Sequence, residues 1–574
     1  VMFKQLAMVV GFSLTCSLVA AITLVPMLSA RWLRGNGEQS LDILRSGRTL
    51  ALLNRWGAKL DSIYRTVLRA ALDHRWITVG AALLLVLGAA LLAPRVGTEL
   101  MPETDEGEVR LDGDMEIGTR LEVVSETFLE VERIVRAAVP ELDQIVVSIG
   151  GSLRRGSGSH NGQARINLKP RSQRRRSSAQ VADDLRRRLA QVPGVSMRVR
   201  AGQGLFIMRM GTSGGDRLAV EIRGHDFETA QALAERVQAV VAGTPGVTDT
   251  IISREAGMPE RRILIDRRKA ADLGVTVDDI ATVLETVLGG ASAGYFRQEG
   301  DQHRILVQAV RAEFLPLEEV LDVVVINRAG SPVVLRNVVD IVPSVGPSLV
   351  ERRNQERIIN VTGEISGRDL GSVIADVRAG LSEVPVPSGF EVVFVGDYEE
   401  QQKSFRELVF SLILAIVLVY MVMACQFESL RDPLVVIFAV PLAAIGVVTM
   451  LFLTGTTFNV QSFIGCIMLA GIVVNNAILL VDQANLLRRR DGLSLRAAVE
   501  EAGRRRLRPI FMTALTTMLG LTPMALGMGE GGEAQAPMAR AVIGGLLSAT
   551  MITLVFIPAV YLALEQRRER RHAA

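Results

Sequence analysis

Polar side chains interrupt an otherwise apolar stretch between residues 463 and 482. Asn475 and Asn476 stand next to each other near its middle, and Asp482 closes it. On a helix, Gly471, Asn475 and Asp482 share one face. Amides and carboxylates are costly in hydrocarbon and normally face the interior of a helix bundle or a path for ions. The spacing therefore predicts a polar pathway through a membrane.

A hydroxyl stripe follows in the next apolar stretch, where Thr513, Thr516, Thr517 and Gly520 recur at helical spacing. Small and hydroxyl residues also let helices approach closely, so this stripe alone fits packing as well as it fits a pathway. The adjacent asparagines favour the pathway. Arg506, just before the stretch, completes this polar set.

Enzyme chemistry finds no support in the sequence. No recognisable nucleophile, metal or phosphate-loop arrangement includes any of the scattered histidines, which are His74, His160, His225, His303 and His572. All three cysteines lie in apolar blocks, which leaves no disulfide or zinc framework in the polar middle. The net charge is only +3, which argues against a nucleic-acid partner. We predict a non-enzyme without cofactor or metal.

The elements that must position the polar residues are membrane helices. A helix needs roughly 20 mostly apolar residues to cross a bilayer. Buried helices of a soluble core rarely repeat that length without a charge, and here only Asp482 is ionisable. Seven stretches qualify as spans: Leu6–Ala30, Trp76–Ala93, Leu408–Cys425, Leu434–Leu453, Phe463–Asp482, Ile510–Met528 and Ala541–Leu564.

The basic residues predict the direction of these spans. Segment 31–75 holds nine Lys and Arg residues, and segment 484–509 and the tail after Leu564 are also Arg-rich. Short basic loops stay in the cytoplasm, so residues 94–407 are expected outside. The same threading places the N-terminus outside, with the first span beginning almost at once. We therefore expect further sequence upstream.

The external region reads as two α+β units. A strand–helix–strand–strand–helix–strand order, typical of ferredoxin-like folds, spans residues 108–199. A similar pattern begins at 218–252 and resumes at 357–395, with a strand-and-helix insertion over 253–350. Basic and Gly/Ser-rich stretches at 150–162 and 171–178 are expected to be exposed loops.

Three motifs in order carry a family resemblance: Gln426–Pro433, Asn475–Asp482 and Arg506–Thr513. With them, essentially the whole chain resembles the second half of a resistance–nodulation–division efflux permease. The pattern is similar to the hydrophobe/amphiphile branch, the inner-membrane part of tripartite multidrug pumps. The resemblance implies a homotrimer in the bacterial inner membrane that exports amphiphiles with the proton gradient. It also implies a periplasmic adaptor and an outer-membrane channel as partners.

The resemblance implies a fold class and domains. We expect an α-helical transmembrane bundle, with seven of twelve spans present, and α+β ferredoxin-like periplasmic porter subdomains with an inserted docking subdomain. The expected parts are a span at 1–30, a cytoplasmic loop at 31–75, a span at 76–93, a porter subdomain at 94–209, a second at 210–252 and 351–400, docking at 253–350, five spans at 401–564 and a cytoplasmic tail at 565–574.

The resemblance also assigns a proton relay. Such pumps couple aspartates of the fourth span to polar groups of the tenth and eleventh, and the matching positions here are Asn475 and Thr513. Many relatives have Lys at the position of Asn475, and a neutral amide cannot act as a counter-ion. The fourth span is absent from the chain. We therefore predict that the chain does not pump without an upstream half.

Aromatic side chains typically line the external cleft of drug pumps, but they make up only 5% of this chain. Arg154, Arg155 and Arg165 lie in the corresponding region, so less apolar or anionic substrates are an open alternative. A basic loop is more often merely solvated. Met208 and Met210 could bind soft Cu(I), but such a pair is more typical of packing.

Two other functions stay open at this point. Half-length chains of the same superfamily occur as protein-export accessories, although the docking-like insertion argues against that. A membrane scaffold that transports nothing would have no need of the asparagine and threonine stripes.

Overall fold

The computed structural model describes residues 2–32, 48–102, 104–150, 160–201, 217–253, 258–310, 316–346, 350–529 and 531–573. It divides into two compact units. One comprises Val1–Pro102 with Gln401–Ala574, and the other comprises Glu103–Glu400. Each has cores of its own.

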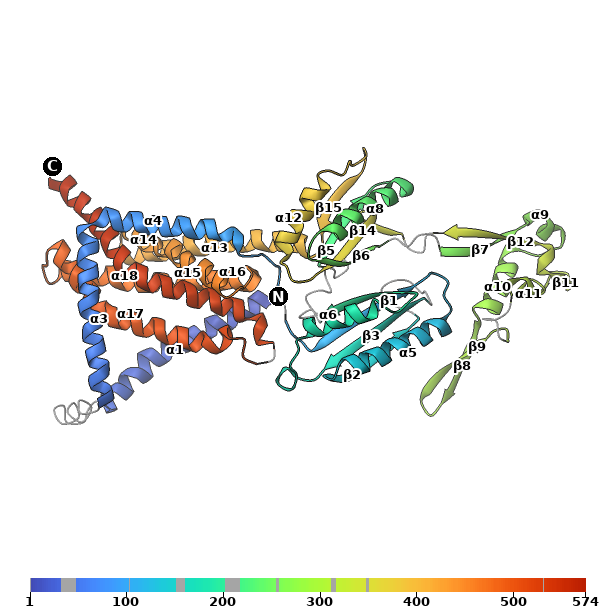
Figure 1. The fold of residues 1–574 in the computed structure, drawn as a ribbon, viewed down its shortest axis with the longest axis horizontal. Helices are drawn as coiled ribbons and strands as arrows, with labels where there is room; N and C mark the ends of the chain where they lie inside the picture. The colour runs from blue at the N-terminus through green and yellow to red at the C-terminus, as the bar shows by residue number, and fades with distance from the viewer. Residues whose placement is uncertain are drawn as a thin grey trace. The chain divides into compact units, whose positions relative to one another are not determined.

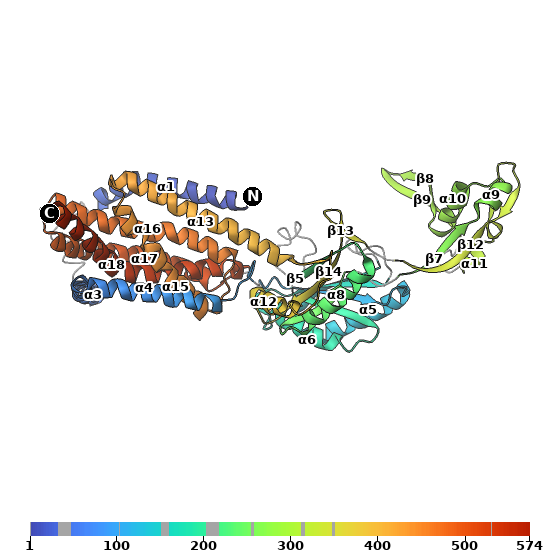
Figure 2. The same cartoon turned by 90° about the horizontal axis from the view of Figure 1, so that it is seen from above.

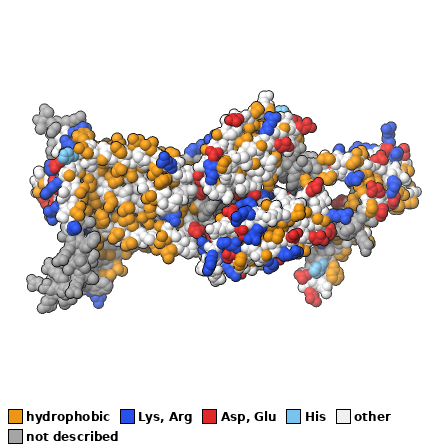
Figure 3. Space-filling view, in the orientation of Figure 1, with side chains coloured by type: hydrophobic (Ala, Val, Ile, Leu, Met, Phe, Trp, Pro, Cys, Tyr) orange, Lys and Arg blue, Asp and Glu red, His pale blue; other side chains and the backbone are white. Residues whose placement is uncertain are grey.

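The first unit is helical. Its helices are α1 (Met2–Trp32), α3 (Arg48–Asp73), α4 (Arg75–Leu92), α13 (Asp397–Phe427), α14 (Asp432–Ile437), α15 (Ala439–Leu453), α16 (Val460–Arg489), α17 (Leu495–Ala525) and α18 (Ala536–Ala573), with short turns η1 (Ala93–Arg95) and η5 (Gly532–Ala534). Helices α15, α16, α17 and α18 run side by side (Figure 1, Figure 2). Hydrophobic side chains cover most of the visible face of this unit (Figure 3).

Six helices in the described part of the chain are long and apolar enough to cross a membrane, whereas the sequence predicted seven spans. The remaining stretch, Ile510–Met528, lies mostly in the second half of α17. That helix begins at Leu495, runs through Pro509 and ends at Ala525, so much of its length is the charged segment before the apolar one. The seventh span remains a prediction.

Small residues bring α15 and α18 together. A Cβ added at Gly446 would lie 2.0 Å from the carbonyl oxygen of Gly544 and 2.3 Å from Oγ of Ser548. The hydroxyl of Ser548 also accepts a hydrogen bond from the Gly446 N–H at 3.1 Å. Such close backbone contact is how membrane helices pack when lipid supplies no hydrophobic drive between them.

The second unit contains the two predicted α+β folds. The first has β1 (Glu108–Met115), α5 (Leu121–Ala138), β2 (Leu142–Ile149), β3 (Asn161–Leu168), η2 (Arg171–Gln173), α6 (Ser178–Leu189) and β4 (Val195–Ala201). Its antiparallel sheet has the order β2-β3-β1-β4. Buried side chains alternate along β1 and face α5 and α6, so one sheet face is covered and the other carries the polar residues.

The second fold repeats this plan across the insertion. Its elements are β5 (Leu218–Arg223), α8 (Phe227–Gly243), β6 (Val247–Ile252), β13 (Glu351–Arg353), β14 (Glu356–Ile365), α12 (Leu370–Leu381) and β15 (Glu391–Val395). The sheet order is β13-β14-β5-β15, and β6 also pairs with β14. Strands from two segments that are far apart in the sequence therefore form one sheet.

The insertion has its own small core. It contains β7 (Met258–Ile265), α9 (Arg267–Asp272), α10 (Val277–Leu288), β8 (Ala291–Gln298), β9 (Asp301–Val307), α11 (Leu317–Val320), β10 (Val324–Ile326), β11 (Pro332–Val334), η4 (Leu335–Asn337) and β12 (Val339–Gly346). Strands β7 and β12 pair antiparallel where the chain enters and leaves it.

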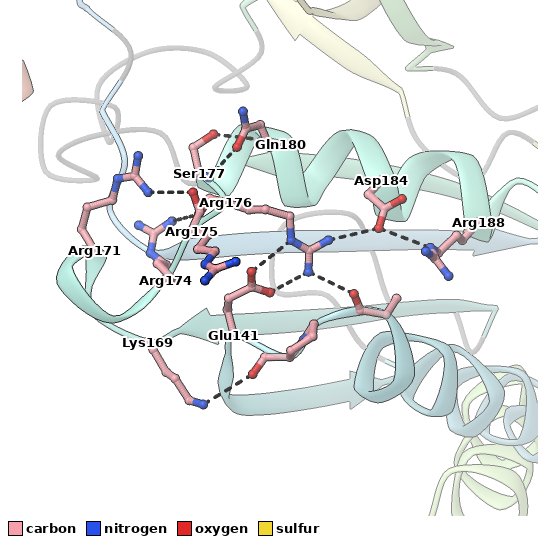
Figure 4. A network of polar contacts seen from close by, with 12 residues as sticks. Glu141, Lys169, Arg171, Arg174, Arg175, Arg176, Ser177, Gln180, Asp184 and Arg188 are labelled. Carbon is pink, nitrogen blue, oxygen red and sulfur yellow. Dashed lines mark hydrogen bonds and ion pairs between the residues drawn. The ribbon is translucent and has the colours of Figure 1, made fainter.

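One predicted exposed loop is wrong in part. Within segment 171–178, the Arg174 side chain is only 1% exposed and pairs with Asp105 at 2.5 Å. Ser178 begins α6, where its backbone N–H donates to Asp105 at 3.2 Å. Nearby, Arg176 binds Glu141 at 2.6 Å and Asp184 at 3.2 Å (Figure 4). The basic run is visible in the sequence, but the carboxylates of Asp105, Glu141 and Asp184 that pair with its arginines are brought there only by the fold.

The other predicted loop, 150–162, also differs at its end. His160 and Asn161 are buried, and Asn161 begins β3. Residues 151–159 lie outside the described residues.

Candidate functional site

Helix α16 places its polar residues on one face. A capping box of Asn459 and Ser462 starts the helix, and each side chain accepts a hydrogen bond from the other's backbone N–H. Val473 and Leu480 are buried against the helical core, which fixes the rotation of the helix. Asn475 and Asp482 consequently lie on the exposed side, and Asn476 is half-buried.

Helix α17 presents its hydroxyl stripe in a similar way. Ile510 and Ala514 are buried in the core, while Thr513 and Thr516 are exposed. The Thr513 hydroxyl donates to carbonyl oxygens of its own helix, at 3.2 Å to Pro509 and 3.0 Å to Ile510. Hydroxyls in apolar helices commonly satisfy themselves in this way. The stripe therefore does not join α17 to another described helix.

The two polar faces lie open. No hydrogen bond or ion pair joins Asn475 or Asp482 to another residue in the described part of the chain. A Cβ added at Gly471 or at Gly520 would meet no atom within 4 Å. We use the name open polar face for the exposed residues of both helices together: Gly471, Asn475 and Asp482 of α16, and Thr513, Thr516 and Gly520 of α17. Packing between described helices, the simpler explanation of the stripes, does not account for it.

Apart from the carboxylate of Asp482, the chemistry of this face is that of a neutral hydrogen-bonding surface. An amide offers both donors and an acceptor, and a hydroxyl offers one donor with acceptor capacity, but neither changes charge near neutral pH. Arg506 is half-buried and lies about two helical turns before Thr513. Its buried Nε has no hydrogen-bond partner among the described residues. The described residues contain no cluster of His, Cys, Asp and Glu that could hold a metal ion.

Sequence reasoning missed a second polar cluster at the end of α16 and α18. The Tyr561 hydroxyl donates to Oδ1 of Asn485 at 2.5 Å, and the Asn485 amide approaches Asp432 at 3.5 Å. Arg488 and Glu565 pair at 2.8 Å beside them. The helical spacing of Asn485 with Arg488, and of Tyr561 with Glu565, was the available signal. These groups satisfy one another and so stabilise the bundle.

Arg165, predicted in the external region, lies exposed on β3 and directly opposite Arg110 of β1. Glu108 lies 3.3 Å from Arg165 and 2.5 Å from Arg110, so one carboxylate serves two guanidinium groups. The polar face of this sheet is thus ionic rather than aromatic. Arg154 and Arg155 lie outside the described residues, as do Met208 and Met210.

Comparison with known proteins identifies the family. The model of the AcrB/AcrD/AcrF family matches residues 1–565, nearly the entire chain. The chain belongs to this family. It is a family of resistance–nodulation–division permeases, as the three sequence motifs indicated.

The chain is similar to curated proteins whose names refer to metal resistance and to others whose names refer to multidrug resistance. The cobalt-zinc-cadmium resistance protein CzcA of Cupriavidus metallidurans is 27% identical, over 99% of this chain and 53% of its own length. The nickel and cobalt resistance protein CnrA of the same organism is 30% identical, over 99% and 52%. The multidrug resistance protein MdtC of Edwardsiella ictaluri is 28% identical, over 99% and 54%.

A crystal structure of a heavy metal efflux pump matches with a TM-score of 0.77 at 27% identity, covering 89% of this chain and 52% of that chain. The permease fold, with apolar helical spans and a sheet-containing domain, is therefore shown. The chain spans about half the length of the relatives that it matches. The multidrug branch suggested by the sequence is not singled out, because metal and drug exporters match alike.

Proposed function

We propose that this chain acts as the C-terminal half of an inner-membrane permease in a proton-driven, tripartite efflux pump. The observation that carries the proposal is the open polar face. Asn475 and Thr513 are exposed on apolar segments of α16 and α17. The family matches residues 1–565 of the chain, but the chain spans only about half of the relatives' length. Polar groups in membrane helices normally face other protein or a water path, not lipid.

The open polar face would form a proton relay with helices from the other half of the permease. Carboxylates on those helices would load and release the proton, while Asn475 and Thr513 would hydrogen-bond to them. Because an amide carries no charge, Asn475 would sense the proton through the direction of its hydrogen bond rather than as a counter-ion. Asn476, Asp482 and Arg506 would keep this path polar and hydrated.

The 574 residues alone would then not transport. Among described candidate spans, α16 carries its carboxylate, Asp482, near the end rather than at mid-depth. A proton carrier must be supplied by another chain or segment.

The two α+β folds would act as porter subdomains and the insertion over 253–350 as a docking subdomain, in a homotrimer with a periplasmic adaptor and an outer-membrane channel. The ionic sheet face that contains Glu108, Arg110 and Arg165 supports a cargo with polar groups. We therefore propose amphiphilic compounds with a charged or strongly polar part as cargo.

Divalent metal cations are the second candidate cargo. The specific observation in their favour is the similarity to proteins whose names refer to cobalt, zinc, cadmium and nickel resistance, together with the match to a heavy metal pump structure.

Growth of a bacterium that lacks its own permeases of this family tests both candidates. Cells would express the chain with a complementary N-terminal half, and the inhibitory doses of amphiphilic drugs and of cobalt, zinc and nickel salts would be measured. We expect protection in one of the two panels, and no protection when either half is expressed alone. Protection by the isolated chain would contradict the half-permease proposal.

A further inference from the structure

The two α+β folds of residues 103–400 meet through unpaired strand edges. Among the described residues, strand β4 pairs only with β1, β6 pairs only with β14, and β4 lies beside β6. Exposed edges readily extend into one continuous sheet through backbone hydrogen bonds. No backbone hydrogen bond joins β4 to β6 among the described residues of either strand. The meeting edges are therefore held by side chains.

Two ion pairs bridge this junction. Arg186 of α6 donates to Asp249 of β6 at 3.1 Å, and Nε of Arg200 on β4 lies 2.9 Å from Glu364 on β14. Both arginines belong to the first fold and both carboxylates to the second. The side chains are shielded, since Asp249 is 12% and Glu364 only 8% exposed.

The arginines are oriented from their own fold. Arg186 also donates to the carbonyl oxygen of Val199 at 2.7 Å and to Asp183 at 2.6 Å. Arg200 has a second, more distant carboxylate, Asp112, at 3.9 Å. Each guanidinium group therefore keeps a partner on the first fold if the second fold moves away.

The carboxylates lie at an irregularity in the backbone. Asp249 has φ of +54°, in the left-handed region that is uncommon for residues other than glycine. The pairing of β14 with β6 shifts register between Thr362 and Glu364, directly opposite this point. A bulge bends an edge strand, re-aims side chains and prevents pairing with a neighbouring edge. Here it turns both carboxylates toward the first fold while blocking a continuous sheet.

From this arrangement we infer that Arg186–Asp249 and Arg200–Glu364 form a charge latch that holds the two α+β folds together and releases them as separate bodies. Shielded ion pairs lose hydration on closing, so they add little net stability compared with an apolar contact of the same area. They do fix one geometry. On opening, the carboxylates regain water and the arginines keep Asp183 and Asp112. The latch thus gives a defined closed state that opens at small cost.

The purpose of the latch, passage of cargo between the folds, rests on the proposed function, but its existence does not. The test therefore measures the distance between the two folds and does not depend on transport. The full chain, with Cys16, Cys425 and Cys466 replaced by Ser, would carry spin labels at Glu130→Cys on α5 and Ala379→Cys on α12, both exposed positions. The distribution of distances between the labels would be measured by pulsed electron resonance in detergent.

We expect one main distance in the otherwise unchanged chain. The Arg186→Gln and Arg200→Gln double variant should show at least a threefold larger fraction at longer distances. The isosteric pair Asp249→Asn and Glu364→Gln should do the same, which covers the case that the first variant fails to fold.

The matched control is Arg136→Gln, because Arg136 pairs with Glu132 inside α5 and not across the junction. It should leave the distribution unchanged. Distances that stay the same in both latch variants, or that lengthen equally in the control, would overturn the latch. A latch confirmed in a chain that confers no resistance would remove only its proposed purpose.

Discussion

Individual polar residues in this protein differ in what surrounds them. Arg174 and Asp105 are enclosed and form an ion pair, whereas Asn475 is exposed on an apolar helix with no hydrogen-bond partner among the described residues. The first arrangement is typical of a group that stabilises a fold. The second is typical of a group whose partner lies on another chain or segment. The two residues should therefore respond to substitution in opposite ways.

Replacing Arg174 by Gln should destabilise the first α+β fold by about 3 kcal/mol, because Asp105 would lose its buried cation and keep only the exposed Arg171, at 3.6 Å. Hydrogen exchange of strands β1 to β4 in the intact chain measures this. Arg175→Gln is the matched control, since the exposed Arg175 forms no ion pair with a described residue, and it should change stability by less than about 0.5 kcal/mol. Equal effects would contradict the assignment.

The same pair predicts a pH dependence. Burial alone would raise the pKa of Asp105, but hydrogen bonds from Arg174 and Ser178 outweigh it and hold the pKa below its ordinary value. A carboxyl group with a lowered pKa contributes stability above its unfolded pKa of about 3.9, and loses it as pH falls through the folded value. Acid should therefore remove most of the difference between the wild-type chain and Arg174→Gln.

Asn475→Leu should leave the thermal stability of the chain unchanged, because the exposed amide forms no hydrogen bond or ion pair with a described residue. It should abolish export by the assembled pump. Val473→Asn on the same helix is the contrasting variant: Val473 is buried in the helical core, so an unpaired amide there should cost about 1–3 kcal/mol. Strong destabilisation by Asn475→Leu would show that the amide is structural.

At the scale of elements, hydropathy and periodicity predict much of this fold. The order of strands and helices in both α+β folds follows from alternation and helical spacing, because each element buries one face. The start of α17 was not predicted. The sequence predicts a basic loop up to Pro509 and a span from Ile510, but the helix already begins at Leu495 and continues through the proline, which removes only one backbone hydrogen bond.

Other features depend on pairing between distant elements and could not be predicted. The bulge at Asp249 exists only because β6 pairs with β14, about a hundred residues later in the chain. The burial of Arg174 likewise depends on Asp105, which approaches from the segment before β1. For the candidate site, the sequence singled out Asn475 and Thr513 as polar residues within apolar segments. Only the structure shows that both side chains are exposed.

Close packing of α15 on α18 gives a prediction for these elements. Gly446→Ala should lower the unfolding temperature of the helical unit, because its Cβ would lie 2.0 Å from the Gly544 carbonyl oxygen. Gly80→Ala on α4 is the matched control, since its Cβ would meet nothing within 4 Å. That change should be neutral or slightly stabilising through helix propensity. Thermal unfolding in detergent compares the two, and equal tolerance would argue against the close contact.

The whole molecule consists of two units and spans about half the length of the relatives that it matches. A helical unit displays a polar face without a described partner, and a separate α+β unit consists of two folds joined by a charge latch. Proton-coupled transport requires both a group that changes charge and a surface that senses the change. In the proposed function, the chain would contribute the hydrogen-bonding surface, and the titrating group would come from the part of the permease that this chain does not span.

The most direct test of this account is proton release from liposomes. The chain would be reconstituted with a complementary N-terminal half, and substrate-dependent dissipation of an imposed pH gradient would be followed with a trapped pH-sensitive dye. The account predicts dissipation by the two halves together, none by the chain alone, and loss of the signal in Asn475→Leu without loss of assembly. Substrate-dependent dissipation by the chain alone, or an Asn475→Leu pump that behaves as the unchanged one, would contradict it.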